Sequence, residues 1–534
     1  MKPLLSGSPN TTDKSQNSRH IPCAVHLESQ QMPRSGRHDG PCLILLSAVS
    51  DPTTLDLLES DSRGHLGKQD IATCYTLPTI LIDWSIVMTS QQTRRRFLKS
   101  TVATGVATST ALSAASWGRV YGANSKLRVA SVGCGGKGWS DLVSTAASPM
   151  VDVVALCDID ESKEHLGRAA EKFSAAKTYT DWRKLFENHK DFDAVIVSTP
   201  DHMHAPVSLP AMQLRKHVQC QKPLTHTVFE ARQMQLAAKK YNVVTQMGNQ
   251  IQSHQAYRTA VKLVHDGVIG KVKEVHSWQS GDMGWILADD RPSGSEAIPS
   301  TVHWDEWIGV APGRPFLPKI YHSFNWRAWQ DFSNGQLGDF GCHILDPVFM
   351  ALKLNAPVSL RAEAAPMNKE VWYKRSMVQY EFPGNEMTVG KTLKVTWYDG
   401  KDHYPSDQAT GLTRSDLPKS GSVLIGEKGT LVIPHVASPK LYPVEKFADY
   451  KIELVPARDH YVSWADACRG EDKTTSHFDY AGPLAEAVLL GTIAIRLPQT
   501  LLAWDAGKMQ LSGALQAQQM LTKSYRPGWQ PTFV

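Results

Sequence analysis

The chain has 534 residues, which is enough for two or three domains with cores of their own. Hydrophobic residues make up 42% of it and charged residues 20%, which is ordinary for a soluble globular protein. The net charge of +5 is small for this length and no basic stripe is present, so the sequence argues against nucleic acid as a partner.

Residues 1–87 differ in composition from the rest of the chain. They are rich in Ser, Pro and His and show no sustained periodicity. Their apolar patch, Ile80–Val87, is short and interrupted by Asp83, so it does not read as a membrane span. We expect residues 1–87 to be a disordered upstream extension, with translation beginning at Met88.

Residues 88–123 resemble a twin-arginine (Tat) export signal. Thr93–Lys99 (TRRRFLK) precedes a modestly apolar stretch of small residues, and cleavage sites follow within 111–115 and 121–123. The alternative is a basic linker with a chance pair of arginines. The signal predicts export of a folded protein by the twin-arginine machinery to the periplasm or cell envelope; without it, the protein would be cytoplasmic.

A glycine-rich turn after an apolar strand carries the clearest signal. Leu127–Val132 is β-prone, and the sequence GCGGKG that follows it fits G-x-G-x-x-G. In this pattern the glycines allow a sharp turn, close approach of a pyrophosphate, and close packing of the next helix on the strand. Free N–H groups at the helix N-terminus would hold the phosphates. The predicted cofactor-binding glycines are Gly133, Gly135, Gly136 and Gly138.

An acidic residue ends the next predicted strand. Val151–Cys157 runs into Asp158, 20 positions after Gly138, where a carboxylate is expected to bind the adenosine ribose. Its charge would repel a 2′-phosphate, and no Lys or Arg follows until Lys163. The sequence therefore favours NAD(H) over NADP(H). A flexible surface loop would give the same glycines, but the strand context and the spaced acid favour a dinucleotide site.

Residues 124–250 alternate between strand and helix patterns, which predicts an α/β Rossmann domain with a parallel sheet covered on both faces. The predicted strands are Leu127–Val132, Val151–Cys157, Ala194–Ser198, His217–Cys220 and Val243–Met247. The predicted helices are Gly136–Ala147, Glu161–Ser174, Trp182–Asn188, Ala205–Arg215 and Val228–Tyr241.

Residues 251–534 predict a substrate-binding α+β domain with a large, mostly antiparallel open sheet. Its C-terminal helices are expected to pack back on the Rossmann domain, and 281–335 is expected to form loops. The predicted strands are Lys273–Gln279, Val358–Ala364, Ser376–Phe382, Thr392–Tyr398 and Val423–Ile425, and the predicted helices are Tyr257–His265, Leu337–Leu354, Tyr461–Arg469 and Leu484–Arg496.

Three polar clusters follow predicted strands, at the sheet edge where ligands of parallel sheets gather. They are residues 199–204 (TPDHMH), 221–223 (QKP) and 248–250 (GNQ), and we expect them around the nicotinamide half of the cofactor. For the two histidines, gating of the cleft or packing at a helix entry is the alternative. The predicted cofactor-binding residues here are Thr199, Pro200, His202, His204 and Asn249.

Lys222 stands out in the second cluster, because its ammonium group would point into the cleft from a strand end. There it could bind a substrate hydroxyl, stabilise the alkoxide and hold the carbinol carbon over the nicotinamide. A solvated surface lysine is the alternative.

A second group with catalytic potential lies on the predicted helix Leu337–Leu354. Asp339, His343 and Asp346 are spaced i, i+4, i+7 and would share one face. His343 suits a general base for a secondary alcohol. Asp339 could bind the substrate or orient the imidazole ring, and Asp346 could bind substrate. A structural histidine at a helix end is equally compatible with this segment. Trp326, with His303, Trp304 and Trp329, could shape a sugar pocket, although a core role is the alternative for each.

The eight cysteines form no C-x-x-C pair and no cluster with metal-ligand spacing, so no metal site is predicted. Their apolar surroundings favour buried thiols, and spacing alone predicts no disulfide.

Together the motifs resemble those of the glucose–fructose oxidoreductase/inositol dehydrogenase/MocA (Gfo/Idh/MocA) family of sugar oxidoreductases. The resemblance runs from about Lys126 to the end. In that family the lysine of a Glu-Lys-Pro motif and an Asp-x-x-x-His pair form the catalytic group, which implies Lys222, Asp339 and His343 here. Some members of that family are exported through the twin-arginine route with the cofactor already bound, which implies the same for this chain. By analogy with the family, we also expect face-to-face dimers or tetramers. The motifs are 133–138 (GCGGKG), 198–204 (STPDHMH), 221–223 (QKP), 247–250 (MGNQ) and 338–346 (GDFGCHILD).

One residue departs from the family pattern. Gln221 stands where the usual Glu precedes the lysine, so a negative charge that could hold Lys222 in place is missing. The leading hypothesis is nonetheless an NAD(H)-dependent oxidoreductase acting on a sugar or cyclic polyol, with the cofactor tightly bound. The alternatives are a redox-assisted, NAD-dependent glycosidase or lyase, and a non-catalytic cofactor or sugar sensor.

Overall fold

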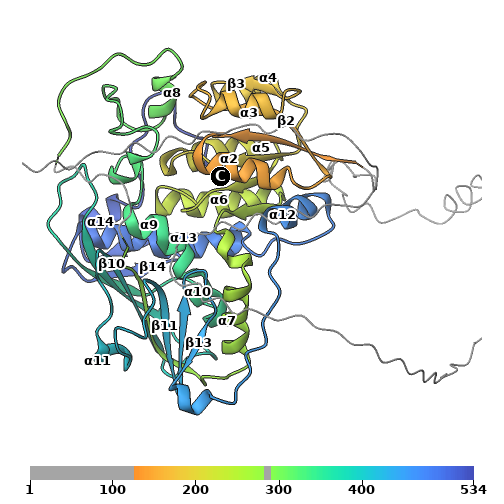
Figure 1. Ribbon diagram of the computed structural model, residues 1–534. Coiled ribbons are helices and arrows are strands. Elements are labelled where there is room, and N and C mark those ends of the chain that lie inside the picture. The colour runs from red at the N-terminus through yellow and green to blue at the C-terminus, as the bar shows by residue number, and fades with distance from the viewer. Residues whose placement is uncertain (1–124, 282–289) are drawn as a thin grey trace, which may run out of the picture. The chain divides into compact units, whose positions relative to one another are not determined.

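The computed structural model describes residues 125–281 and 290–534 (Figure 1). The upstream extension expected at 1–87 and the export signal expected at 88–123 lie outside the described residues. The described part of the chain contains two β-sheets, with helices packed against both.

The first sheet in the described part has six parallel strands in the order β3-β2-β1-β4-β5-β6, as a Rossmann domain requires. Successive residues of β1 point to opposite faces, so Val129 lies in one apolar cluster and Ala130 in another. The strands are β1 (Leu127–Val132), β2 (Val151–Cys157), β3 (Lys177–Tyr179), β4 (Ala194–Val197), β5 (His217–Cys220) and β6 (Thr245–Met247), with α2 (Gly136–Thr145), α3 (Leu166–Lys172), α4 (Trp182–Asn188), η1 (Asp201–Met203), α5 (His204–Gln213), α6 (Val228–Tyr241) and η2 (Gln250–Ser253).

Two parts of this domain differ from the sequence prediction. The short edge strand β3 was not predicted, because it has three residues and two of them are exposed. The helix expected over Glu161–Ser174 begins only at Leu166, since the side chains of Asp158 and Asp160 accept N–H groups at residues 160 and 162 and hold this stretch in a turn.

The second sheet has nine strands in the described residues, in the order β13-β12-β11-β7-β10-β9-β8-β14-β15. All neighbouring pairs are antiparallel except β7 and β10, so the predicted mostly antiparallel open sheet is confirmed. The strands are β7 (Val272–Gln279), β8 (Ser359–Ala364), β9 (Arg375–Pro383), β10 (Thr392–Gly400), β11 (Ser420–Gly426), β12 (Thr430–Pro434), β13 (Lys440–Tyr442), β14 (Leu502–Asp505) and β15 (Gln510–Ser512).

The helices that accompany this sheet include one correction. The single helix expected over Leu337–Leu354 is two helices, α9 (Gly335–Ile344) and α10 (Asp346–Leu352), because Pro347 starts a new helix and cannot donate to a preceding turn. The others are α7 (Gln255–His265), α8 (Trp304–Ile308), η3 (Asn325–Ala328), α11 (Asp407–Thr410), η4 (Val444–Phe447), α12 (His460–Arg469), α13 (Phe478–Arg496) and α14 (Leu515–Gln519).

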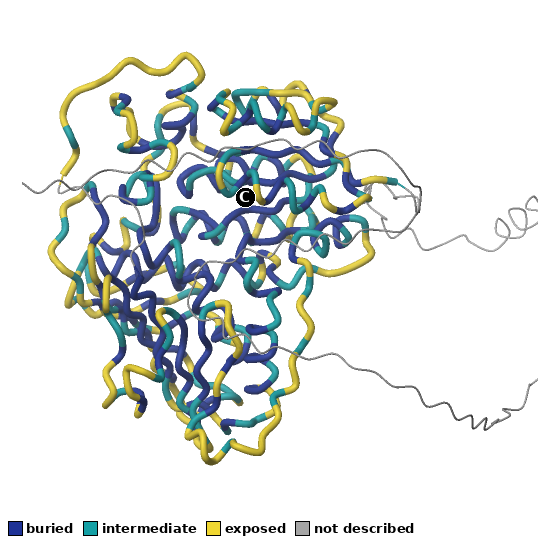
Figure 2. The backbone as a smooth tube through the Cα atoms, viewed as in Figure 1, coloured by how far each residue is buried: buried dark blue, intermediate teal, exposed yellow. Residues whose placement is uncertain are grey.

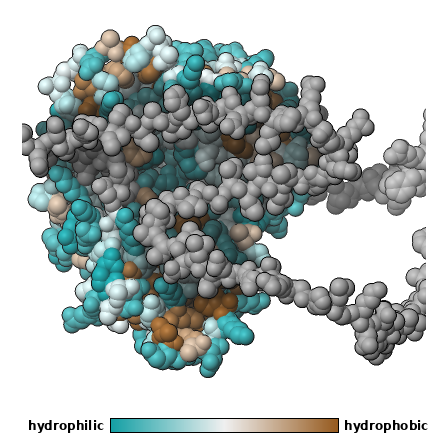
Figure 3. Space-filling view, viewed as in Figure 1, coloured by the Kyte–Doolittle hydropathy of each residue, from teal (hydrophilic) through white to brown (hydrophobic). Residues whose placement is uncertain are grey.

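The late helices join the two sheets. Trp464 of α12 is fully buried in the same apolar cluster as β1 and β2, and α13 contacts α6 of the first domain and β8 of the second. Among the described residues α13 alone is long and apolar enough to cross a membrane, but its apolar window is 83% buried inside the protein. It is the central core helix, and Figure 2 shows its region as mostly buried. Where the described residues are visible in Figure 3 they are mostly hydrophilic, with an apolar patch at the lower end, where Figure 1 labels β13.

Candidate active site

A cavity of about 1010 Å³ lies at the carboxyl ends of the parallel strands. Its walls come from the glycine turn after β1, from the ends of β2, β4 and β5, and from α9 and the loops of the second sheet. Six predicted cofactor residues line it directly, together with the three predicted catalytic residues. These nine are Gly133, Gly135, Gly136, Asp158, Thr199, Pro200, Lys222, Asp339 and His343.

The glycine turn has the geometry that a dinucleotide needs. Gly133 has φ +87°, and a Cβ there would lie 2.6 Å from the carbonyl oxygen of Ser198. A Cβ on Gly138 would lie 2.1 Å from the carbonyl oxygen of Gly133, so helix α2 packs on β1 more closely than any side chain allows. No side chain caps the N-terminus of α2. Its backbone donors are therefore suited to a pyrophosphate.

Asp158 supports the glycine turn as well as lining the cavity. Its Oδ2 accepts hydrogen bonds from the backbone N–H of Cys134 (2.6 Å) and Gly135 (3.2 Å), and its Oδ1 accepts one from Asp160 (3.0 Å). The spacing predicted only a ribose contact. The turn and its bracing carboxylate fit an NAD-type dinucleotide, with the adenosine half nearest Asp158.

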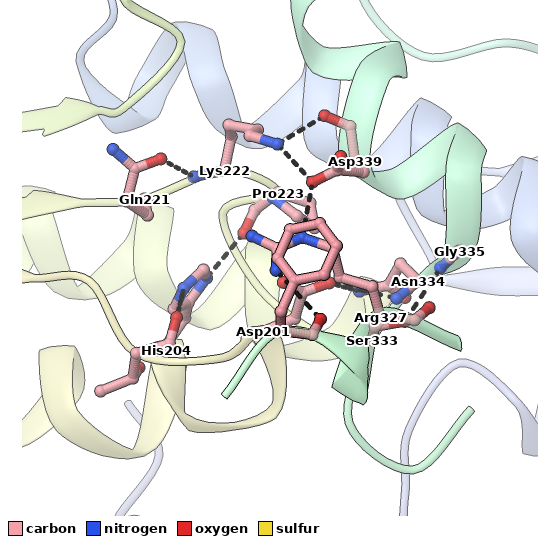
Figure 4. A network of polar contacts seen from close by, with 12 residues as sticks. Asp201, His204, Gln221, Lys222, Pro223, Arg327, Ser333, Asn334, Gly335 and Asp339 are labelled. Carbon is pink, nitrogen blue, oxygen red and sulfur yellow. Dashed lines mark hydrogen bonds and ion pairs between the residues drawn. The ribbon is translucent and has the colours of Figure 1, made fainter. Parts of the chain in front are cut away.

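Lys222 and Asp339 form a close ion pair inside the cavity. The Nζ of Lys222 donates to Oδ1 of Asp339 (2.5 Å) and to its backbone carbonyl (2.6 Å). Figure 4 shows the lysine reaching from the end of β5 to α9. Burial alone would raise the pKa of Asp339, but the charges of Lys222 and Arg327 outweigh it and hold that pKa below its usual range. The carboxylate of Asp339 is therefore ionised at neutral pH.

Gln221 is tied to a different carboxylate. Its Nε2 donates to Oδ2 of Asp141 (2.8 Å), a fully buried residue on α2. Asp141 also accepts from Lys137 (2.5 Å), Ser198 (2.8 Å) and Tyr461 (2.9 Å). A carboxyl group that is missing at 221 is thus present at 141, and Lys222 is held by Asp339 instead. The expected loss of a partner for Lys222 does not occur.

His343 lies in the cavity as an uncharged imidazole. Burial, followed by the nearby charge of Lys222, lowers its pKa well below the usual value. Its ring forms no hydrogen bond with another described residue, and its Nδ1 is buried without a partner among them. An unprotonated, uncommitted ring nitrogen is what a general base requires.

A second histidine beside His343 was not predicted. His435 follows β12 and lines the cavity, with its ring centroid 5.9 Å from that of His343. Its Nδ1 is 2.8 Å from the hydroxyl of Tyr257. Burial and the charge of Lys222 lower its pKa to about 4, so it too is uncharged. Only the pairing of β11 with β12 brings residue 435 to this site, and no local motif marks it.

Asp201 and Arg327 also face the cavity and were not predicted. Asp201 accepts hydrogen bonds from the backbone N (3.1 Å) and the Nδ2 (3.2 Å) of Asn334. Burial and the negative charge of Asp339 raise its pKa to about 7. The guanidinium of Arg327 stacks 4.3 Å from the ring of Trp326, and its Nε lies 3.6 Å from Asp339. Asp201 belongs to the 199–204 cluster, in which only Thr199, Pro200, His202 and His204 were predicted as site residues.

The predicted pocket tryptophans separate into two groups. Trp326 lines the cavity, as expected for a substrate contact. Trp304 and Trp329 do not, because they pack with Tyr321 in an apolar cluster behind the wall. His303 pairs with Glu161 at the surface, 2.8 Å apart, and takes no part in the pocket lining.

Five predicted site residues lie outside the cavity lining. The ring of His202 packs against Trp307 and Phe332, and burial lowers its pKa to about 3. Packing at the helix entry therefore describes it better than cofactor contact. The other four are Gly138, His204, Asn249 and Asp346. Gly138 packs under the turn, and Asn249 accepts a hydrogen bond from Ser476. The ring nitrogens of His204 lie 2.8 Å from the carbonyl oxygens of Pro223 and Thr199.

Asp346 needs a correction as a substrate residue. The break between α9 and α10 turns it away from Asp339 and His343 and into the core. There it accepts hydrogen bonds from Tyr480 (2.6 Å) and Gln252 (3.0 Å) and is fully buried. The five cysteines of the described part are likewise buried and free, as the sequence favoured.

The site can be compared with proteins of known family. A 126-residue stretch of the chain is 30% identical to levoglucosan dehydrogenase of Pseudarthrobacter phenanthrenivorans, covering 24% of this chain and 31% of that protein. A glycosyl hydrolase family 109 protein of Saccharopolyspora erythraea is 30% identical over 248 residues, 45% of this chain and 47% of the relative. The chain thus spans less than half the length of either relative.

Solved structures agree on the fold. The WlbA dehydrogenase of Chromobacterium violaceum, solved with NADH and UDP-GlcNAcA, has a TM-score of 0.51 at 17% identity, covering 72% of this chain and 97% of that one. Residues 127–249 match the model of an oxidoreductase family with an NAD-binding Rossmann fold, and residues 254–391 match that family's C-terminal alpha/beta domain. The chain therefore belongs to the Gfo/Idh/MocA family of oxidoreductases.

Proposed function

We propose that this protein is an NAD(H)-dependent oxidoreductase acting on a hydroxyl group of a sugar or cyclic polyol. The observation that carries the proposal is the shared cavity of three groups: the glycine turn, the Lys222–Asp339 ion pair and the uncharged ring of His343. The relatives named as sugar dehydrogenases support the substrate class.

Each residue has a distinct task in this proposal. His343 accepts the proton of the substrate O–H at a ring nitrogen, while bound NAD⁺ supplies the acceptor for the hydride of the adjacent C–H. Two N–H donors of Lys222 are engaged by Asp339, and the third is left to hold the substrate oxygen. As negative charge develops on that oxygen, the ammonium stabilises it. Asp339 fixes the direction of the ammonium group.

The direct experiment combines nucleotide identification with two variants. Mass spectrometry of the nucleotide released on denaturation should give NAD or NADH, after which sugars are screened for a change in nicotinamide absorbance. His343→Ala and Lys222→Ala should each lower kcat by about 10²-fold or more, with nucleotide content unchanged. His265→Asn, on the exposed end of α7, is the control. Full turnover in both site variants would contradict the proposal and favour a sensor.

We further propose that the cofactor stays bound and is recycled, and that the protein is exported by the twin-arginine route. An exported enzyme meets no free NAD pool, so a second sugar, or the same one, must return the hydride. The support is the arginine-rich segment at 93–99. N-terminal sequencing of the native product tests it: a start beyond residue 110 supports export, and an intact Met1 contradicts it.

A redox-assisted glycosidase is the second candidate, favoured by one structural feature. Asp201 has a pKa of about 7 and lines the same cavity, so it can deliver a proton to a leaving glycosidic oxygen at neutral pH. The relatives named as glycosyl hydrolase family 109 proteins support this class. Sugar release from a glycoside without net formation of NADH would establish it, and Asp201→Asn should then slow release more than oxidation.

A further inference from the structure

A long segment of the second half of the chain is attached to the edge of the Rossmann domain. We call residues 299–328 the strap. The backbone N–H of Glu161 donates to the carbonyl of Thr301 (2.8 Å), and that of His303 donates to the carbonyl of Ile159 (2.8 Å). A β-bridge also joins Asp160 to Val302. Figure 1 accordingly places α8, within the strap, beside α3.

Side chains at the inner face of the strap connect it to the loop after β2. The Nε2 of His322 lies 2.8 Å from Oδ2 of Asp160, at hydrogen-bond distance. The Nε2 of His165 lies 3.7 Å from the same oxygen, and its Nδ1 lies 3.7 Å from Oδ2 of Asp158. We call Asp160, His165 and His322 the latch. Two imidazoles thus share two carboxylates, one of which supports the glycine turn.

The latch stands where a dinucleotide would enter or leave. A Cβ on Gly135 would lie 1.9 Å from the Nδ1 of His165, so this ring covers the glycine at which a pyrophosphate approaches. His165 and His322 both line the cavity together with Gly135 and Asp158. The strap and the loop after β2 therefore close the adenosine end of the cavity from two sides.

We propose that the strap retains the bound dinucleotide, and that the latch of Asp160, His165 and His322 sets the rate at which it is released. The inference rests on the proposed function only in requiring a dinucleotide in this cavity. The three residues are positioning residues: they hold the strap against the glycine turn and take no part in the chemistry. Release requires the hydrogen bond between His322 and Asp160 to break, because the strap must move away from the loop after β2.

The charges of the latch fit this role. The hydrogen bonds from His322 and from the backbone N–H of Ser162 outweigh burial and lower the pKa of Asp160, so its carboxylate is ionised. Burial would lower the pKa of His165, but Asp158 and Asp160 outweigh it and raise that pKa. An imidazole whose protonated form is favoured lies between two carboxylates and helps to hold the loop against the strap. The same three side chains offer donor atoms within 4.8 Å of one another, as a divalent cation would also require.

The test measures cofactor exchange in the full chain loaded with NAD. Asp160→Asn and His322→Gln are incubated with isotopically labelled NAD, and the label bound after gel filtration is followed with time. Loss of a hydrogen bond to a charged group should raise the exchange rate by about tenfold or more. The matched control is Glu370→Gln, which removes an exposed ion pair with Arg291 that lies away from the cavity lining and should leave exchange unchanged.

Four outcomes decide between the possibilities. Faster exchange in both latch variants, at an unchanged melting temperature, supports the proposal. Unchanged exchange in both overturns it while leaving the proposed function standing, and His165→Asn replaces either variant that fails to fold. A wild-type chain that binds no NAD overturns the proposed function and this inference with it. Binding of one equivalent of Zn²⁺ to the wild-type chain that is lost in His322→Gln would overturn the latch in favour of a metal site.

Discussion

At the scale of single residues, the relation between Gln221 and Asp141 explains how this chain departs from its family. A carboxyl group is present at position 141, on α2, and the amide of Gln221 donates to it. Asp141 accepts four such contacts and is fully buried, so it depends on every one of its donors. The motif letters alone suggested a loss that the structure compensates.

This arrangement predicts that restoring the usual family residue is harmful. Gln221→Glu would replace the donor with a second carboxylate facing Asp141, which removes a charge-assisted hydrogen bond and adds repulsion. We expect the free energy of unfolding at pH 7, measured by urea denaturation, to fall by about 1.5–3 kcal/mol. Adding Asp141→Asn should recover part of the loss, because the new amide can donate to the new carboxylate. Undiminished stability of the single variant would contradict the assignment.

The lowered pKa of His343 predicts an unusual pH profile. A general base works when unprotonated, and burial together with Lys222 keeps His343 unprotonated as the pH falls past its ordinary value of 6.5. Asp201, with a pKa of about 7, titrates in the same cavity, so the profile is measured in Asp201→Asn. There kcat/KM should stay level through pH 6.5 and fall only at lower pH. A fall centred between pH 6 and 7 in this variant would show that His343 is not so shifted.

At the scale of elements, two substitutions in the glycine turn should differ in their effect on bound nucleotide. Gly138→Ala places a Cβ 2.1 Å from the backbone of Gly133 and must push α2 away from β1. Gly136→Ala meets open space and bears only the cost of φ +49°. We expect Gly138→Ala to lower the free energy of unfolding by about 1–3 kcal/mol and to lose bound nucleotide. Gly136→Ala should lower the free energy of unfolding by about 1–2 kcal/mol and keep its nucleotide. Denaturation measures the stability of each variant, and the nucleotide released from it measures its cofactor content. Equal loss of nucleotide in the two variants would contradict the close-packing argument.

Local signals predicted the long elements well and the short ones poorly. The strands Leu127–Val132 and Val151–Cys157 and the helix Val228–Tyr241 were predicted with the bounds that the structure has. They combine apolar periodicity with a turn or a cap; the last begins with a capping box at Thr227 and Glu230. The edge strands β13 and β15 have three residues each and are set by pairing with a neighbour, which no local pattern records. The helix break before Asp346 was missed although Pro347 marks it.

At the scale of the whole molecule, the ion pair between Arg232 and Glu486 is among those that join the two domains. Arg232 of α6 donates from Nε and Nη2 to the two carboxylate oxygens of Glu486 on α13, at 2.7 and 2.9 Å. Glu486 is 3% exposed, so its charge has little other solvation. The pair was invisible in the sequence, where 254 residues separate its members.

Removing the arginine should therefore destabilise the whole fold. We expect Arg232→Ala to lower the free energy of unfolding by about 3 kcal/mol at pH 7. Burial raises the pKa of Glu486 and Arg232 opposes that rise, so the variant raises it further. A carboxyl with a raised folded-state pKa costs stability as pH rises, and the deficit should shrink at pH 5. The double change Arg232→Met with Glu486→Leu should restore stability; a deficit independent of pH would contradict this account.

Part of the site could be predicted from the sequence, and there is a physical reason why the other part could not. The motif at the end of one strand pointed to Lys222, because the carboxyl ends of parallel strands meet at one edge. Helical spacing and the family resemblance pointed to Asp339 and His343. Residues such as His435, Arg327 and His322 come from loops of the second sheet, whose positions depend on strand pairings far apart in the chain. His202 and Asn249 were predicted to contact the cofactor, but their side chains are buried beneath the cavity wall.

The position of Trp464 has a consequence for biosynthesis. Its indole packs in the same core cluster as residues of β1, β2 and α2. Yet α12 is synthesised only after the strands β7 to β13 of the second sheet. The nucleotide-binding half therefore cannot complete its interior as an independent unit while translation proceeds, in contrast to the usual N-terminal-first order. Cofactor loading and completion of the fold become a single late event, so a ribosome stalled before α12 would display a chain that does not yet retain nucleotide.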